Sequence, residues 1–216
     1  NSPTALATIA EFTAKYPGTV HVQLDAISYS GIRAANQASF GTAVIPSYDF
    51  EKALVVLSVG ADFLGTWLDG EEHTQDYIKN RNYKSLEAGK MSRHIQFETG
   101  LSMTGTNADV RIAIKPSEEA AVLISLYNEI TGSSLSGGIQ QANAAKAIKL
   151  AAQELSKNKG QAVVVAGAND VNIQPLTNAI NVAIGAYGTT SALANYSQKS
   201  QGAQTAFAAL SGMDTA

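Results

Sequence analysis

The chain has 216 residues, of which 45% are apolar and only 15% are charged, and its formal net charge at pH 7 is −3. This length supplies ample apolar surface for an independent core, and the near-neutral charge argues against nucleic acid or anionic lipid as a partner. The sequence contains no cysteine, which excludes disulfides, thiolate zinc sites, cysteine-ligated iron–sulfur clusters and a cysteine nucleophile within it.

The first fifty residues contain four segments with the pattern of regular elements. They are a helix over residues 4–16 that ends at Pro17-Gly18, a strand over 19–24, a helix over 28–39 and a short extended piece over 43–45. Asp49 or Ser47 is expected to cap the turn that follows.

From residue 53 onward, strands and helices alternate. The expected elements are strand 53–59, helix 69–86, strand 94–97, strand 110–114, a helix opening at 115–119 with Ser117 at its cap, helix 142–158, strand 161–166, helix 173–184 and helix 201–210. This alternation predicts an α/β fold, a Rossmann-like three-layer sandwich with a mainly parallel sheet and helices on both faces.

The domain organisation follows from the same pattern. Residues 1–216 are expected to form one α/β domain, with a flexible connector at about 131–138. Because a helix at the end of such a fold usually leads to another strand, the chain is expected to be a fragment of a longer protein. No apolar run reaches the roughly 18–20 residues of a membrane span, so direct membrane insertion is not expected.

Two of the apolar strands end in nearly the same way. The strand over 53–59 runs into Gly60-Ala61-Asp62, and the strand over 161–166 runs into Gly167-Ala168-Asn169-Asp170. Buried parallel strands deliver their carboxyl ends to the crevice where open α/β sheets bind ligands. The first turn could cradle a nucleotide, with Glu98 accepting ribose hydroxyls. Ordinary turn chemistry is the favoured reading, because neither a Gly-x-Gly-x-x-Gly pattern nor a P-loop is present.

The remaining polar residues predict no catalytic or metal-ligating residue. The three histidines lack metal-ligand spacing: His21 and His94 are expected to be partly buried in strands, and His73 to lie on a solvated helix face with Glu71 and Glu72. No paired carboxylates or Gly-x-Ser-x-Gly elbow is found. Three aromatic residues in or just before the expected 69–86 helix are expected to be helix anchors or interface residues: Trp67, Tyr77 and Tyr83.

The order of motifs resembles the central region of the molybdopterin oxidoreductase superfamily. The matching stretches are YDFEKALVVLSVGADFLGTW, HIQFETGLSMTGTNADVRIAIKPSEEAAVLISLYNEI and QAVVVAGANDVNIQPLTNAINVAIGAYG. That superfamily runs from a strand ending in Gly-x-(Asn/Asp) to a strand ending in an acid, then to Ala-Asp plus a short strand and Pro-(Gly/Ser)-(Thr/Ser)-(Glu/Asp). Here Asn107-Ala108-Asp109-Val110 and Lys115-Pro116-Ser117-Glu118-Glu119 hold the last two places.

Residues 20–67 are most similar to one branch, the molybdopterin-oxidoreductase-like iron–sulfur subunit of bacterial alternative complex III, which oxidises quinols at a membrane. The resemblance implies a non-catalytic, cofactor-free domain that scaffolds the remaining domains of its parent chain and other subunits of an electron-transfer complex. It also implies the bacterial periplasm, at the inner membrane through partner subunits, with iron–sulfur clusters only elsewhere in the parent chain. The parent would be part of an oxidoreductase, and this fragment alone would be inactive.

The resemblance also transfers a cofactor site. In cofactor-binding members, the corresponding residues contact the guanosine part of the pterin dinucleotide: Gly60, Ala61, Asp62, Glu98, Thr99 and Gly100. Relatives commonly have Asn-Pro after the first glycine and Pro-Arg after the acid, whereas this chain has Ala61-Asp62 and Thr99-Gly100. An added carboxylate and a lost cation disfavour an anionic pyrophosphate, so the site is expected to be vestigial.

Two alternatives remain open. The chain could be a fragment of a true molybdenum oxidoreductase that binds the guanosine part of a molybdopterin guanine dinucleotide, or a free-standing nucleotide- or metabolite-binding domain.

Overall fold

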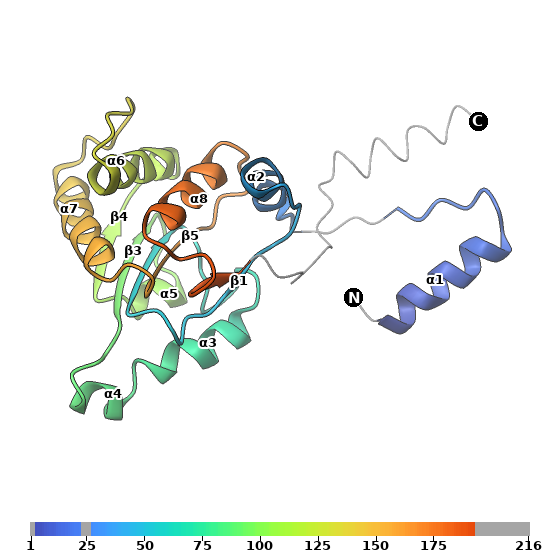
Figure 1. Cartoon of the computed structure of the whole chain (residues 1–216), viewed down its shortest axis with the longest axis horizontal. Helices are drawn as coiled ribbons and strands as arrows, with labels where there is room; N and C mark the ends of the chain where they lie inside the picture. The colour runs from blue at the N-terminus through green and yellow to red at the C-terminus, as the bar shows by residue number, and fades with distance from the viewer. Residues whose placement is uncertain (1–2, 23–26, 193–216) are drawn as a thin grey trace.

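The computed structural model describes residues 3–22 and 27–192, and Figure 1 shows a parallel sheet with helices packed on it. The sheet has four strands: β2 (Val55–Val59), β3 (Arg93–Glu98), β4 (Val110–Ala113) and β5 (Ala162–Ala166). All neighbouring strands are parallel and the order is β4-β3-β2-β5. This is a Rossmann-like α/β fold, as the alternation of elements predicts.

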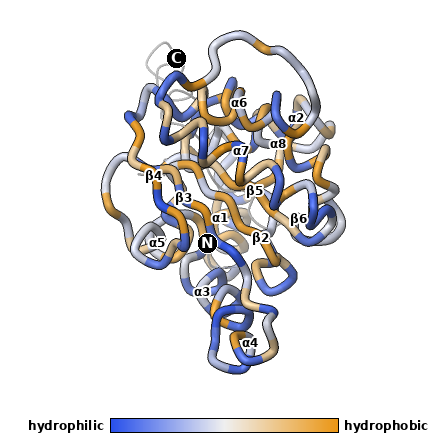
Figure 2. Tube along the Cα trace, turned by 90° about the vertical axis from the view of Figure 1, so that its left-hand side faces the viewer, coloured by the Kyte–Doolittle hydropathy of each residue, from blue (hydrophilic) through white to orange (hydrophobic). Residues whose placement is uncertain are grey.

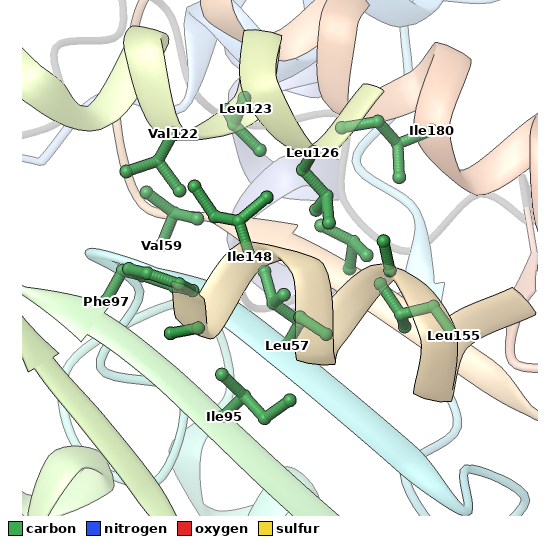
Figure 3. Packing of buried hydrophobic residues seen from close by; sticks show 14 of the residues in the cluster. Leu57, Val59, Ile95, Phe97, Val122, Leu123, Leu126, Ile148, Leu155 and Ile180 are labelled. Atoms are coloured by element: carbon green, nitrogen blue, oxygen red, sulfur yellow. The ribbon is translucent and has the colours of Figure 1, made fainter. Parts of the chain in front are cut away.

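Three helices cover one face of the sheet: α6 (Glu119–Thr131), α7 (Ala142–Lys157) and α8 (Ile173–Ala183). Figure 3 shows side chains of α6 and Ile148 of α7 directed toward Leu57, Val59 and Phe97 of the strands. The core-facing residues of α7 include Ala144, Ala147, Ala151 and Ala152, small side chains that bring helix and sheet close together.

The opposite face is covered mainly by aromatic side chains. Val56 of β2 packs with Phe50 and Phe63, whose rings stack at a centroid distance of 4.5 Å. Helices α2 (Ser30–Phe40) and α3 (Gly70–Lys79) contribute Ile32 and Tyr77 to this cluster. Since both faces are buried, β2 and β5 are apolar except for Ser58, whose hydroxyl donates to the Ala61 carbonyl, and both strands are mainly hydrophobic in Figure 2.

The expected helix over 69–86 is instead two helices, α3 and α4 (Tyr83–Glu87). Asn82 separates them: its side chain donates to the carbonyl of Lys79 and accepts from the N–H of Ser85, which caps the second helix. Trp67 precedes α3 and is buried, whereas Tyr83 is 72% exposed.

The short helix α5 (Met103–Thr106) follows β3, where no helix was predicted. The helix predicted to open at 115–119 is confirmed, because the 3₁₀ helix η1 (Pro116–Glu118) leads directly into α6. The expected cap at Ser117 is wrong, because Ser117 lies inside η1 and Glu118 accepts from the Lys115 N–H at its start. The Asp49 cap is confirmed by its hydrogen bond from the Lys52 N–H.

The N-terminal expectations are confirmed only in part. Helix α1 (Pro3–Lys15) forms but contains no buried residue. Residues 19–22 are not in a strand, because no described strand lies beside them, and 23–24 fall outside the described residues, as does the expected helix 201–210. The extended piece at 43–45 is not a strand. Instead β1 (Ser47–Tyr48) pairs antiparallel with β6 (Ser191–Ala192).

The proposed connector at 131–138 is held at one point by Asn128 of α6. The Asn128 side chain donates to the carbonyl of Leu135 and accepts from its N–H, both at 2.9 Å. Flexibility of the segment stays a prediction.

Candidate functional site

The candidate site lies at the carboxyl edge of the sheet, the edge at which all four parallel strands stop. The strand order reverses between β2 and β5, and open α/β folds bind ligands at such a switch point. Gly60 follows β2 and Gly167 follows β5, so the two similar strand ends do meet at this point. Gly60 has φ +66°, a left-handed conformation that glycine adopts without strain.

The two strand ends are in direct backbone contact. The Gly167 N–H donates to the carbonyl of Val59 at 2.9 Å. A Cβ on Gly167 would lie 2.2 Å from the Gly60 carbonyl oxygen, which is shorter than the contacts that Cβ atoms make in proteins. The close approach of these two backbone segments is therefore enough to explain why residue 167 is glycine.

Two helices, α2 and α6, also contact the residues at these two strand ends. The N–H of Gly31, in the first turn of α2, donates to the side chain of Asn169 at 2.6 Å. From α6, the Glu119 carboxylate lies 2.6 Å from where a Cβ on Gly60 would be. Burial raises the pKa of Glu119. Sequence reasoning did not select Glu119, and a carboxylate here would oppose an anionic ligand.

Asp62 is occupied by internal hydrogen bonds. Its Oδ1 accepts from the Thr104 N–H at 3.0 Å and the Thr104 hydroxyl at 2.8 Å, and its Oδ2 accepts from Thr66. Burial raises the pKa of Asp62, but these hydrogen bonds outweigh it and leave the pKa below its ordinary value. The carboxylate thus joins the segment after β2 to α5.

Glu98 is occupied in the same way and is only 3% exposed. It accepts from the Ser102 hydroxyl at 2.5 Å, from Gln96 at 3.2 Å, and from Arg111 Nε in an ion pair at 2.5 Å. Burial raises the pKa of Glu98, and the bonds from Ser102 and Arg111 lower it further than burial raises it. Its carboxylate also lies where a Cβ on Gly105 would be, so glycine is needed there.

The other transferred positions differ in exposure. Ala61 is fully buried in the aromatic cluster, whereas Thr99 and Gly100 are exposed beyond the end of β3. The structure therefore brings the predicted residues to one edge, but it does not leave the two carboxylates free there.

A row of buried polar side chains continues from Glu98 along β3. His94, Gln96 and Glu98 alternate with Ile95 and Phe97, so they share one face of the strand. Gln96 Nε2 donates to Glu98, and Gln96 Oε1 lies 3.2 Å from His94 Nε2. The spacing His-x-Gln-x-Glu is the sequence signal that could have revealed this row.

The row ends at Tyr77 of α3, whose hydroxyl lies 3.0 Å from His94 Nδ1. Burial lowers the pKa of His94 to about 4, so its ring is neutral at pH 7 and carries one N–H. A proton on Nε2 would donate to the Gln96 oxygen. The single Tyr77 hydroxyl proton then has two acceptors within reach, His94 Nδ1 at 3.0 Å and the Asn107 carbonyl at 3.1 Å. Burial raises the pKa of Tyr77 to about 12, so the hydroxyl keeps its proton.

The other two histidines differ from expectation. His73 is buried, not solvated: its Nδ1 lies 3.2 Å from the Phe63 carbonyl and its ring is packed against Phe50. His73 and Tyr77 are four residues apart on α3 and therefore share its inner face, a spacing that could have indicated burial. His21 is exposed, not partly buried. Burial of His94 is confirmed.

Within residues 3–22 and 27–192, no group of three or more histidine, aspartate or glutamate side chains could hold a metal ion. Over the same ranges, no helix has the length and apolar character needed to cross a membrane.

Comparison with models of protein families finds no match for this chain. Comparison with curated proteins likewise finds no similar sequence.

Proposed function

We propose that this chain is a non-catalytic, cofactor-free structural domain of a molybdopterin-oxidoreductase-like subunit in a membrane-associated complex that oxidises quinols. The resemblance of its motifs to that family supplies the identity of the complex. Its partners would be the remaining domains of the parent chain and the other subunits, in the bacterial periplasm, with iron–sulfur clusters elsewhere in the parent.

The observation that carries the cofactor-free part is the internal use of Asp62 and Glu98. A carboxylate that recognises a ligand hydroxyl needs a free acceptor position facing the ligand. Both carboxylates instead accept several hydrogen bonds from neighbouring segments of the same chain, Asp62 from Thr104 and Thr66 and Glu98 from Ser102, Gln96 and Arg111.

The crowding of the switch point supports the same proposal. The Gly60 and Gly167 backbones touch, and the Glu119 carboxylate lies beside Gly60. A pyrophosphate at this place would have to displace the backbone contact and approach a carboxylate, and both would weaken binding.

The test is to purify the full-length parent protein with its native complex and to measure molybdenum by elemental analysis and pterin fluorescence after acid oxidation. A molybdenum oxidoreductase processed in parallel serves as the positive control. We expect molybdenum far below one atom per chain and co-purification with iron–sulfur and membrane subunits. Stoichiometric molybdenum would contradict the cofactor-free part, and a protein that purifies without partner subunits would contradict the scaffold part.

A guanine-nucleotide titration distinguishes this proposal from the alternative that the chain is a fragment of a molybdenum oxidoreductase. We expect GDP at millimolar concentration to leave the thermal unfolding midpoint unchanged, with ADP as the matched control. A GDP-specific rise in the midpoint that is absent in Glu98→Ala, measured against each variant's own ligand-free midpoint, would favour the pterin dinucleotide instead.

A further inference from the structure

The opposite end of the sheet contains a cavity of about 720 Å³. We call this end the amino edge, because the strands begin there. The cavity lies between the start of β2, the segment before β3 and the last turn of α7, and it is lined by Leu54, Arg93 and Lys157 among others. This volume is in the range of small-molecule sites, and none of the six residues of the transferred cofactor site lines it.

Three cations line this cavity: Lys90, Arg93 and Lys157. Among the residues that the structure describes, none of the three forms an ion pair, whereas Lys52, Lys79, Arg81 and Arg111 all do. The Nε of Arg93 is buried and has no hydrogen-bond acceptor within the described part of the chain. A buried donor without an acceptor is costly. The Arg93 side chain as a whole is half-buried, so a shift that brought this Nε to a ligand oxygen would remove that cost.

Two carboxylates also line the cavity, and they offset the three cations only in part. Asp109 is held by Arg81 through two hydrogen bonds of 2.8 and 2.9 Å, so its charge is already paired. Glu154 remains as the opposing charge. The Glu154 carbonyl near the end of α7 is capped by the backbone and side-chain N–H groups of Asn158, which reduces the negative character of that helix end.

The remaining lining is mixed. Ser92, Asn158 and Gln161 are polar, whereas Leu54 and Met91 are apolar, and Met91 is 43% exposed. An arginine fork binds two oxygens of a carboxylate or phosphate side by side, and lysines add attraction without fixed direction.

We propose that the amino-edge cavity binds a small organic oxyanion, a carboxylate or phosphate group carried on an apolar body. The anionic group contacts Arg93 with Lys90 and Lys157 beside it, and the apolar body packs along Leu54 and Met91. This site is separate from the carboxyl edge and does not rest on the proposed function.

The test titrates the full 216-residue chain with phenyl phosphate, benzoate and the uncharged benzyl alcohol, followed by backbone amide NMR shifts and calorimetry. We expect saturable binding of an anion, shifts at residues 89–93 and 157–161, and no saturable binding of benzyl alcohol. Tighter phenyl phosphate assigns phosphate esters as the ligand class, and tighter benzoate assigns carboxylates.

The variants distinguish this site from general charge attraction. Arg93→Gln is expected to weaken binding about tenfold or more, and Arg93→Lys is expected to weaken it also, because lysine lacks the fork. Lys90→Gln combined with Lys157→Gln provides a second variant that keeps Arg93 in place, and we expect it to weaken binding several-fold. Lys146→Gln, an exposed position of α7 outside the cavity, is the matched control.

Three results would overturn the proposal. They are the absence of saturable anion binding, equal binding of benzyl alcohol, and unchanged affinity in the variant that lacks both lysines.

Discussion

The two ends of the parallel sheet use charged side chains in opposite ways. At the carboxyl edge, Asp62 and Glu98 accept hydrogen bonds from their own chain and tie neighbouring loops together. At the amino edge, Lys90, Arg93 and Lys157 surround a cavity and have no ion-pair partner within the described ranges. The charged side chains are therefore satisfied internally at the edge where open α/β sheets bind ligands, and three cations lack ion pairs among the described residues at the opposite edge.

The two proposals together imply that the hydrogen-bond state of the side chains, more than their position in the fold, decides which edge binds a ligand. A charged group whose acceptor positions are filled stabilises the protein, and one without a partner is available to a ligand. Each prediction below tests one side of this comparison.

The largest effect is expected for Glu98→Ala. This change leaves Arg111 and the buried Gln96 without their shared acceptor. Breaking a fully buried pair costs about 3–5 kcal/mol, and because the Arg111 side chain is 28% exposed we expect a loss at the lower end of that range. Urea unfolding measures the loss, with the exposed Glu129→Gln on α6 as the control. If the two variants were equally stable, Glu98 would not hold the carboxyl edge together.

The next effect is a pH dependence of stability due to His94, the buried histidine of β3. Its pKa is about 4 in the folded protein, below the ordinary value of 6.5, so the unfolded chain binds the proton more readily. The neutral ring's contribution is complete above about pH 6.5 and is lost as the pH falls toward 4, which amounts to about 2–3 kcal/mol.

The measurement is the free energy of unfolding at several pH values between 7 and 4.5 in wild type and His94→Gln. We expect the variant to have a smaller slope. Some slope should persist, because burial also lowers the pKa of His73. Identical slopes would show that His94 does not titrate in this way.

A smaller effect is expected for Gly167→Ala at the switch point. The new Cβ would meet the Gly60 carbonyl at 2.2 Å, and forcing the strand ends apart should cost about 2 kcal/mol. Gly100→Ala is the matched control at the same edge, because no atom lies within 4 Å of its Cβ position. Thermal unfolding compares the two. Equal midpoints would mean that the strand ends are not in close contact.

The smallest effect on stability is expected at the amino edge. Replacing Lys90 and Lys157 together by glutamine removes no ion pair of the described residues, so the free energy of unfolding should change by less than about 0.5 kcal/mol. Urea unfolding checks this. A loss comparable to that of Glu98→Ala would show that these cations are structural and would remove the contrast between the two edges.

Much of the fold could be predicted from local patterns. The runs before Gly60 and Gly167 are buried on both faces, so they are apolar apart from Ser58, and this pattern predicts parallel strands. The sequence predicts one helix over 69–86 and not a break at Asn82, because an asparagine in a polar helix pattern can lie inside a helix or cap a second one. His73 was assigned to solvent because its sequence neighbours are charged, although its packing partners are distant in sequence.

The sequence by itself determined the α/β class, the strand ends that meet at the switch point and the absence of thiol chemistry, because composition and periodicity are local properties. Only the tertiary structure decided that Thr104 and Arg111 donate to the carboxylates of Asp62 and Glu98. It also decided that Arg93 borders a cavity and that its Nε has no acceptor among residues 3–22 and 27–192. Hydrogen bonds between segments depend on which loops the sheet order brings together, and that order follows from the packing of the whole domain.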